Sequence, residues 1–163
     1  MEKKLSFFLK ERRPGYEEKD YPFTGFIDLL LRNKKTGNLI FMDHKSSGMK
    51  FKRDGLPYKN EEEHWQNFQR QQLLYTVPFI EAGEKVDFLC WNMFRNQFIK
   101  TIHWSQEGYD EAYNWALDQI HLLENESEWE PNVNFFYCKN LCGYRFNCPY
   151  NEQEDMINEF QEG

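Results

Sequence analysis

An aspartate and a lysine stand two residues apart at the end of an apolar stretch, Asn38 to Lys45 (NLIFMDHK). Because side chains alternate along a β-strand, Asp43 and Lys45 are expected to share one face. A second aspartate, Asp28, lies in the apolar stretch before it. The turn residues between the two stretches predict a β-hairpin, which would bring Asp28 close to Asp43. Two carboxylates would then converge beside one ammonium group.

Such a pair of carboxylates suits a divalent metal ion. Two acids held close in a partly buried place repel each other unless a cation neutralises them. Mg²⁺ prefers oxygen ligands and takes water and substrate phosphate beside one or two carboxylates. A lysine there can orient or help deprotonate a metal-bound water, or stabilise charge on the phosphorus centre. The pattern favours phosphodiester hydrolysis. The alternative is that Asp43 and Lys45 form a weak ion pair at a solvated strand end.

Three short motifs, in this order, resemble those of the PD-(D/E)xK nuclease superfamily. GFID (Gly25 to Asp28), MDHK (Met42 to Lys45) and QQLLY (Gln71 to Tyr75) look like its G-x-x-D, D/E-x-K and Q-x-x-x-Y motifs. The chain resembles the RecB-like branch, which includes the RecB and AddB nuclease domains, CRISPR-associated nucleases and many phage exonucleases. The resemblance implies a restriction-endonuclease-like core and a metal-dependent nuclease.

The resemblance also implies roles for the catalytic residues. Asp28 and Asp43 would be metal ligands, and Lys45 would be the catalytic lysine. The backbone carbonyl of His44 would complete the coordination of the metal. The cofactor implied is Mg²⁺ or Mn²⁺.

DNA contacts are expected from two further groups of residues. Gln71 and Tyr75 lie one helical turn apart on one face, and the resemblance implies that they sit near the active site and contact the DNA strand. Without the other motifs they would be a polar helix face with a half-buried tyrosine. The basic loop that follows, with Lys50, Lys52 and Arg53, could bind phosphates, or it could be an exposed flexible loop.

Three cysteines, Cys138, Cys142 and Cys148, are spaced as C-x3-C-x5-C. Thiolates at this spacing suit an iron–sulfur cluster or zinc, and the alternative is three reduced cysteines that pack the tail. In many RecB-like nucleases a cluster is bound by three C-terminal cysteines and one that precedes the core. Here no cysteine precedes the core, and Cys90 is most simply a core residue. The fourth ligand is therefore not identified.

A helical region usually precedes the first motif strand in the RecB-like family and supplies a histidine or glutamate to the metal site. This sequence has no recognisable counterpart of it. The chain would then be a fragment or short form, completed by a second protein chain or a missing N-terminal segment. Alternatively, it is a reduced version that folds without a cluster.

The periodicity of apolar residues predicts the elements that position these motifs. Strands are expected over 4–11, 25–32, 38–45, 86–94 and 97–104, and helices over 61–82 and 105–124. We expect an α/β (α+β) fold with a mixed central sheet of about five strands flanked by helices. Residues 1–125 would form the nuclease-like core, and residues 126–163 a C-terminal cysteine-containing tail packed on it.

The composition is that of a globular domain. The chain has 163 residues, of which 18% are aromatic, and a formal net charge of −7. This charge argues against a protein that coats nucleic acid by bulk electrostatics. The apolar runs are too short to cross a bilayer and no signal-peptide core is visible, so we expect a cytoplasmic protein of a bacterial or phage-infected cell.

These observations lead to one expected function and two alternatives. The expectation is a metal-dependent DNA nuclease, either an exonuclease or a single-strand-active enzyme. The first alternative is a catalytically degenerate nuclease-like domain that binds DNA or a protein partner. The second is a zinc- or cluster-stabilised interaction module in which the acids are structural.

Overall fold

The computed structural model describes residues 3–46, 48–128 and 135–150. The chain divides into two compact units, Met1–Leu123 and Glu124–Gly163, and each is described by itself. In the second unit the described residues form one short helix, α3 (Phe135–Asn140). All motif residues except the three C-terminal cysteines belong to the first unit.

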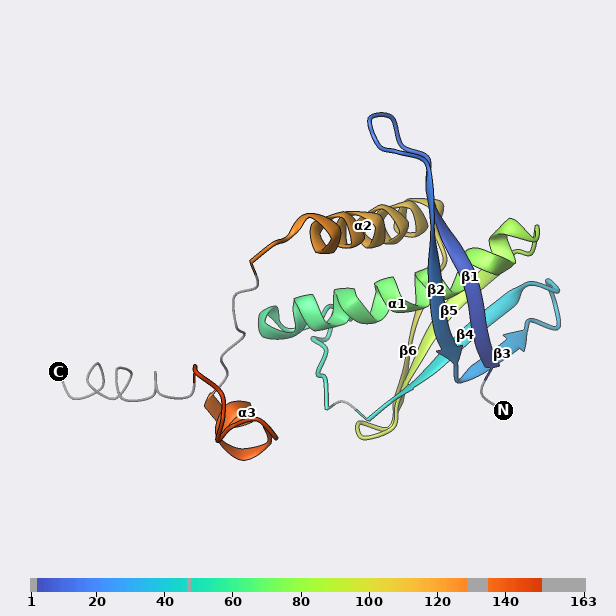
Figure 1. The fold of residues 1–163 in the computed structure, drawn as a ribbon. Helices are drawn as coiled ribbons and strands as arrows, with labels where there is room; N and C mark the ends of the chain where they lie inside the picture. Colours follow the sequence, from blue (N-terminus) through green and yellow to red (C-terminus); the bar gives the residue numbers. More distant parts are fainter. Residues whose placement is uncertain (1–2, 47, 129–134, 151–163) are drawn as a thin grey trace. The chain divides into compact units, whose positions relative to one another are not determined.

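The first unit holds six strands and two long helices among its described residues (Figure 1). In chain order they are β1 (Lys3–Glu11), β2 (Lys19–Ile27), β3 (Leu29–Arg32), β4 (Leu39–Lys45), α1 (Glu62–Glu81), β5 (Val86–Met93), β6 (Phe98–His103) and α2 (Gln106–Asn125), with a short 3-10 turn, η1 (Lys59–Glu61), before α1. The expected mixture of helices and strands is confirmed.

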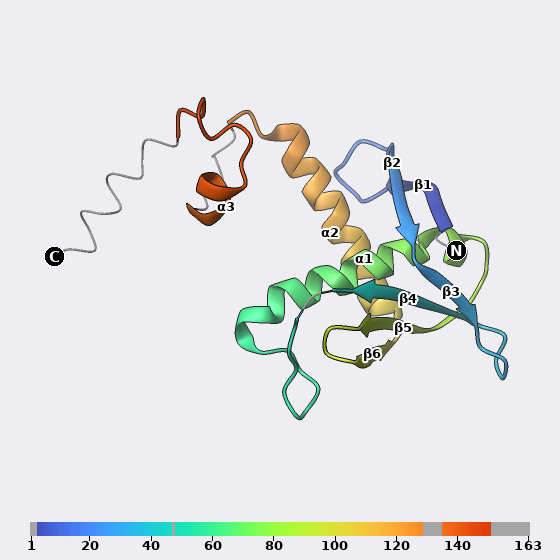
Figure 2. The same cartoon turned by 90° about the horizontal axis from the view of Figure 1, so that it is seen from below.

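The strands form two sheets rather than one. A four-stranded mixed sheet has the order β3-β4-β5-β6, in which β4 and β5 are parallel, while β1 and β2 form a separate antiparallel ribbon. The predicted mixed central sheet is confirmed, but it has four strands rather than about five, because β1 pairs with β2 outside it. The β4–α1–β5 segment is a parallel crossover, which brings α1 back over the sheet (Figure 2).

The predicted strand over residues 25–32 is broken at Asp28. Up to Ile27 the chain pairs with β1, and from Leu29 it pairs with β4. The break has a local cause, because a carboxylate oxygen of Asp28, rather than a backbone carbonyl, accepts the hydrogen bond from the His44 amide at 2.7 Å. The residue expected to bind metal thus stands where the chain passes from the ribbon to the sheet.

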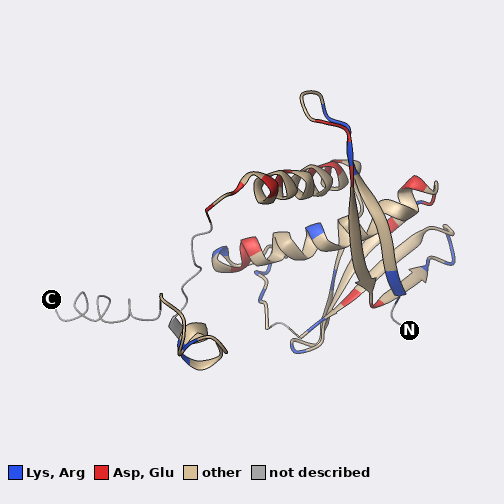
Figure 3. Ribbon diagram, viewed as in Figure 1, with Lys and Arg blue, Asp and Glu red and all other residues tan. Residues whose placement is uncertain are grey.

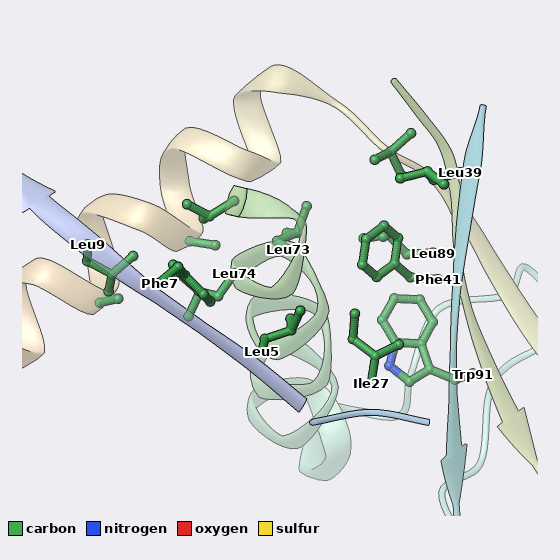
Figure 4. Close-up of a cluster of buried hydrophobic side chains, with 14 of the residues drawn as sticks. Leu5, Phe7, Leu9, Ile27, Leu39, Phe41, Leu73, Leu74, Leu89 and Trp91 are labelled. Atoms are coloured by element: carbon green, nitrogen blue, oxygen red, sulfur yellow. The ribbon is translucent and has the colours of Figure 1, made fainter. Parts of the chain in front are cut away.

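Helix α1 lies between the ribbon and the four-stranded sheet (Figure 4). On one side the β4 residue Phe41 packs edge-on against Phe79 of α1, with ring centroids 5.3 Å apart. On the other side β1 directs Leu5, Phe7 and Leu9 inward at every second position. The hydrophobic core therefore fixes α1 relative to the end of β4, where Asp43 and Lys45 lie.

Two sets of polar contacts, a helix cap and a buried carboxylate, further stabilise the first unit. Ser105 caps α2, since its hydroxyl accepts a hydrogen bond from the Gly108 amide at 3.1 Å. The fully buried Glu11 at the end of β1 accepts hydrogen bonds from Arg13 and contacts the Nε2 atom of His121 on α2 at 2.8 Å. This carboxylate joins the ribbon to α2.

Across the described residues, no helix is long and apolar enough to span a membrane.

Candidate active site

Lys45, the last residue of β4, is the centre of the site. Its Nζ atom lies 2.9 Å from Oδ2 of Asp43 and donates a hydrogen bond of 2.9 Å to Oε1 of Gln71. The ammonium group also lies 4.3 Å from the ring centroid of Phe68, so two turns of α1 enclose it. Both charged side chains are largely buried, with 17% of Lys45 and 12% of Asp43 exposed. The alternative that Asp43 and Lys45 form an ion pair at a solvated strand end therefore does not fit their burial.

Asp28 lies beside the same pair, as the expected hairpin predicts. The β3–β4 ladder pairs Leu29 with Met42, and its next position sets Asp28 opposite Asp43. The carboxylate of Asp28 is fixed there by the His44 amide. Because the N–H and C=O of one strand residue point to the same side, the His44 carbonyl is directed to this edge as well. The two carboxylates therefore lie close together, and the His44 carbonyl as a metal ligand stays a prediction.

Two buried oxygen atoms near this place have no hydrogen-bond donor in the described part of the chain: Oδ2 of Asp43 and Oε1 of Gln72. The ammonium of Lys45 is close to Asp43, but its direction does not make a hydrogen bond. The orientation of Gln72 is fixed, because its Nε2 atom donates to the Cys90 carbonyl at 2.7 Å.

Asp43 and Gln72 line one small cavity together with Asp28 and Tyr75. Its volume is about 10 Å³, which is close to the space that one water-sized sphere fills. Unpartnered acceptors around a space of this size fit a cation, or a water that donates to both of them. The donor set, which is oxygen throughout, suits Mg²⁺ or Mn²⁺ rather than a metal that prefers sulfur.

The third motif completes the arrangement from α1. Gln71 donates to the hydroxyl of Tyr75 at 3.1 Å, so a continuous chain of contacts runs from Asp43 through Lys45 and Gln71 to Tyr75. The i,i+4 spacing predicted this neighbourhood. In turn, Tyr75 lies against the backbone of Gly25, the first residue of the GFID motif.

The basic loop after β4 has an ordered backbone. Lys52 donates to the carbonyl of Leu56 at 2.7 Å, and the Asn96 side chain holds the carbonyl of the buried Met49 at 2.6 Å. The side chains of Lys50, Lys52 and Arg53 are exposed and form no ion pair within the described residues. In Figure 3, Lys and Arg colour parts of the segment between β4 and α1 blue. The loop thus presents three unpaired cations from a fixed backbone, although the chain as a whole is acidic.

The expected cluster or zinc site does not appear as an assembled group. Cys138, Cys142 and Cys148 are free thiols of intermediate exposure, and Cys90 is buried as predicted. Within the described ranges, no three or more His, Cys, Asp or Glu side chains are grouped so as to hold a metal. The metal at these cysteines stays a prediction.

Comparison with known proteins does not indicate a function for this chain. No family model, no curated protein and no solved structure matches this chain. The PD-(D/E)xK resemblance therefore stays a prediction that rests on the three motifs.

Gln72 and Phe68 were expected on one stripe of the helix over 61–82, but neither was predicted as a site residue. Both lie on the face of α1 that covers the sheet, one or three residues from Gln71. A signal for Gln72 was present, because it is an amide next to the apolar pair Leu73 and Leu74 on a buried helix face, where an unpaired polar group is costly.

Proposed function

We propose that this protein is a metal-dependent deoxyribonuclease that hydrolyses phosphodiester bonds at Asp28, Asp43 and Lys45. The observation that supports the proposal best is the convergence of three sequence motifs at one place. The Asp43–Lys45–Gln71 contacts join β4 to α1, and the His44 amide joins Asp28 to the same strand. Residues that served only the fold would not need to bring two carboxylates and a lysine together in a largely buried place.

Asp28, Asp43 and the carbonyl of His44 are the groups that would hold a divalent metal. When bound, Mg²⁺ or Mn²⁺ supplies a water of lowered pKa and neutralises charge on the phosphate. In the described part of the chain, Oδ2 of Asp43 accepts no hydrogen bond and its close partner is the ammonium of Lys45 at 2.9 Å, so this oxygen still has room to accept from a cation.

The chain's own residues would position the reacting groups. The ammonium of Lys45 is held by the acceptor Oε1 of Gln71, which leaves a positive charge fixed beside the carboxylates to stabilise the charge that develops on the phosphate. Tyr75, hydrogen-bonded to Gln71, extends this fixed array along α1. The exposed cations of Lys50, Lys52 and Arg53 would bind the phosphates of the strand beyond the site.

The test is cleavage of DNA by purified protein with Mg²⁺ or Mn²⁺. Asp43→Asn and Lys45→Met should each abolish cleavage, whereas Asp110→Asn on α2 and Lys34→Met in the β3–β4 turn should leave it unchanged. Thermal melting of each variant checks the fold. The proposal fails if the wild-type protein with metal cuts neither single-stranded nor duplex DNA, or if Asp43→Asn cuts as fast as the wild type.

One observation favours the degenerate-domain alternative. Two acids rather than three lie at the site, and in the described part of the chain no larger cluster of metal-binding side chains occurs. Calorimetric titration with Mn²⁺ separates the two functions. A nuclease should bind the ion at a site that Asp43→Asn removes, whereas a degenerate domain should bind DNA with an affinity that does not depend on metal.

A further inference from the structure

A second and larger cavity adjoins the candidate active site. Its volume is about 570 Å³, within the roughly 300–1,000 Å³ range of small-molecule sites. Its walls come from the β1–β2 ribbon, α1 and α2, and are formed by Leu9, Pro22, Phe23, Asn67, Gln71, Leu74, Tyr75, Trp115, Ala116, Gln119 and Ile120. Gln71 and Tyr75 belong both to this cavity and to the contact chain that begins at Lys45. The cavity and the site therefore share a wall.

The chemical character of the cavity is specific. No Asp, Glu, Lys, Arg or His is among its lining residues, so it does not suit a phosphate or a metal ion. Three aromatic side chains line it, Phe23, Tyr75 and Trp115, and the amides of Asn67 and Gln119 bring donors and acceptors. A flat, neutral, aromatic group with polar edges matches these walls.

The cavity is held in shape by contacts outside it. The guanidinium of Arg70, bound by Glu111, lies 4.5 Å from the ring centroid of Trp115 and fixes that ring. On the ribbon, the Lys10 amide donates to the hydroxyl of Tyr113 on α2 at 2.6 Å. The cavity is thus formed before any ligand enters it.

We propose that this cavity binds an unpaired nucleobase of the DNA strand that is cut. The proposal rests on the proposed function, because the nucleobase is assigned from the shared wall: a phosphate at Lys45 places its neighbouring base beside Gln71 and Tyr75. The base would stack on the aromatic walls, and stacking of this kind tolerates every base. The side-chain amides of Asn67 and Gln119, which form no hydrogen bond within the described residues, would hydrogen-bond to the base edge.

The substrate class follows from the geometry of the base. A nucleobase inside the cavity cannot keep its Watson–Crick partner, so the strand at the site must be single or locally opened. We therefore assign to the protein a single-stranded DNA substrate, or a frayed duplex end, in preference to an intact duplex.

The experiment measures binding without cleavage. Fluorescence anisotropy, with EDTA present, gives the affinity for a set of labelled single-stranded oligonucleotides in which one abasic site moves along the sequence. One position should lose roughly tenfold or more in affinity, because the stacked base is missing there. A matched blunt duplex should bind more weakly than the intact single strand.

Variants test whether the lost base is the one in the cavity. In Trp115→Leu and in Gln119→Ala, the intact strand should bind more weakly and the effect of the abasic site should shrink. In Asn114→Ala, an exposed amide of α2 that does not line the cavity, the effect should persist in full. Gln119 is exposed, so its variant should stay folded if Trp115→Leu does not.

If the affinity of the wild-type protein is the same for every position of the abasic site, the proposal that the cavity binds a base is wrong, even if the protein cleaves DNA. An abasic effect that is equally large in Gln119→Ala and in the wild type also overturns it. A position-specific abasic effect in a protein that never cleaves DNA leaves the pocket in place and refutes the nuclease. The two proposals therefore fail separately.

Discussion

The backbone of Gly25 in β2 lies directly against the aromatic ring of Tyr75 in α1. A Cβ atom at residue 25 would come 2.3 Å from Cε1 of Tyr75, a distance that real Cβ atoms essentially never show. The ribbon and α1 can approach this closely because residue 25 has no side chain. The first and third motifs therefore form one packing contact as well as one sequence pattern.

Gly25→Ala should lower the free energy of unfolding by about 1–3 kcal/mol, because the added methyl group overpacks a contact with a ring. Urea denaturation followed by circular dichroism measures this. Gly48→Ala is the matched control: there the nearest side-chain atom lies at 3.4 Å, and we expect a much smaller change. In a Tyr75→Leu background the cost of Gly25→Ala should fall, and equal costs in both backgrounds would contradict the contact.

Gln72→Leu should weaken Mn²⁺ binding by roughly tenfold to a hundredfold, the usual effect of losing a polar group that supports a metal site. The reason is that Gln72 and Asp43 line one cavity, and within the described residues neither Oε1 of Gln72 nor Oδ2 of Asp43 accepts a hydrogen bond. Calorimetric titration gives the affinity, and Gln69→Leu, a neighbour on α1 that lines a different pocket, is the control. Unchanged Mn²⁺ affinity in a folded Gln72→Leu variant would show that Gln72 serves packing alone.

Replacing Lys50, Lys52 and Arg53 together by alanine should make the binding of single-stranded DNA less dependent on salt. Each cation that leaves a phosphate lowers the slope of log K against log salt by about 0.7. Anisotropy titrations between low and moderate salt measure the slope. The control is the pair Lys34→Ala and Lys35→Ala in the β3–β4 turn, and an equal loss of slope in both sets would indicate non-specific attraction.

Stability should fall at acid pH through Glu11. Hydrogen bonds from Arg13 lower the pKa of this buried carboxyl from 4.5 to about 2. Because the folded-state pKa is the lower one, the stabilising contribution is present above about pH 4.5 and is lost as the pH falls toward 2. The contribution at neutral pH is about 3 kcal/mol.

Urea denaturation at a series of pH values tests this. Glu11→Gln should be less stable than the wild type at neutral pH and should lose less stability between about pH 5 and pH 2. Asp118→Asn, which removes the exposed partner of the same Arg13, should have a small effect. Identical acid profiles for Glu11→Gln and the wild type would show that other carboxylates govern the acid transition.

Local patterns predicted much of the site. The approach of Asp28 to Asp43 follows from the length of the turn between two strands, and the contact between Gln71 and Tyr75 follows from helical spacing. Such relations span few residues, so the sequence contains them. The strands expected over 86–94 and 97–104 were predicted on the same basis, and they form the antiparallel pair β5 and β6.

Strand pairing and contacts between residues far apart in the sequence could not be predicted. From Gly25 to Arg32 the apolar residues on both sides of Asp28 favour a strand, and nothing in that stretch indicates that β2 pairs with β1 while β3 pairs with β4. The partner of Glu11 is His121, 110 residues away. The shared cavity wall at Gln71 depends on the meeting of three elements, and no single segment carries that information.

The chain changes sheets at Asp28, and this has a mechanical consequence. The carboxylate there is tied to β4, while the residues before it belong to a ribbon that is fastened to α2 through Glu11. A force or a ligand that tilts the ribbon therefore acts on Asp28 through one residue of backbone. The position of Asp28 relative to Asp43 is therefore set by the ribbon as well as by β4.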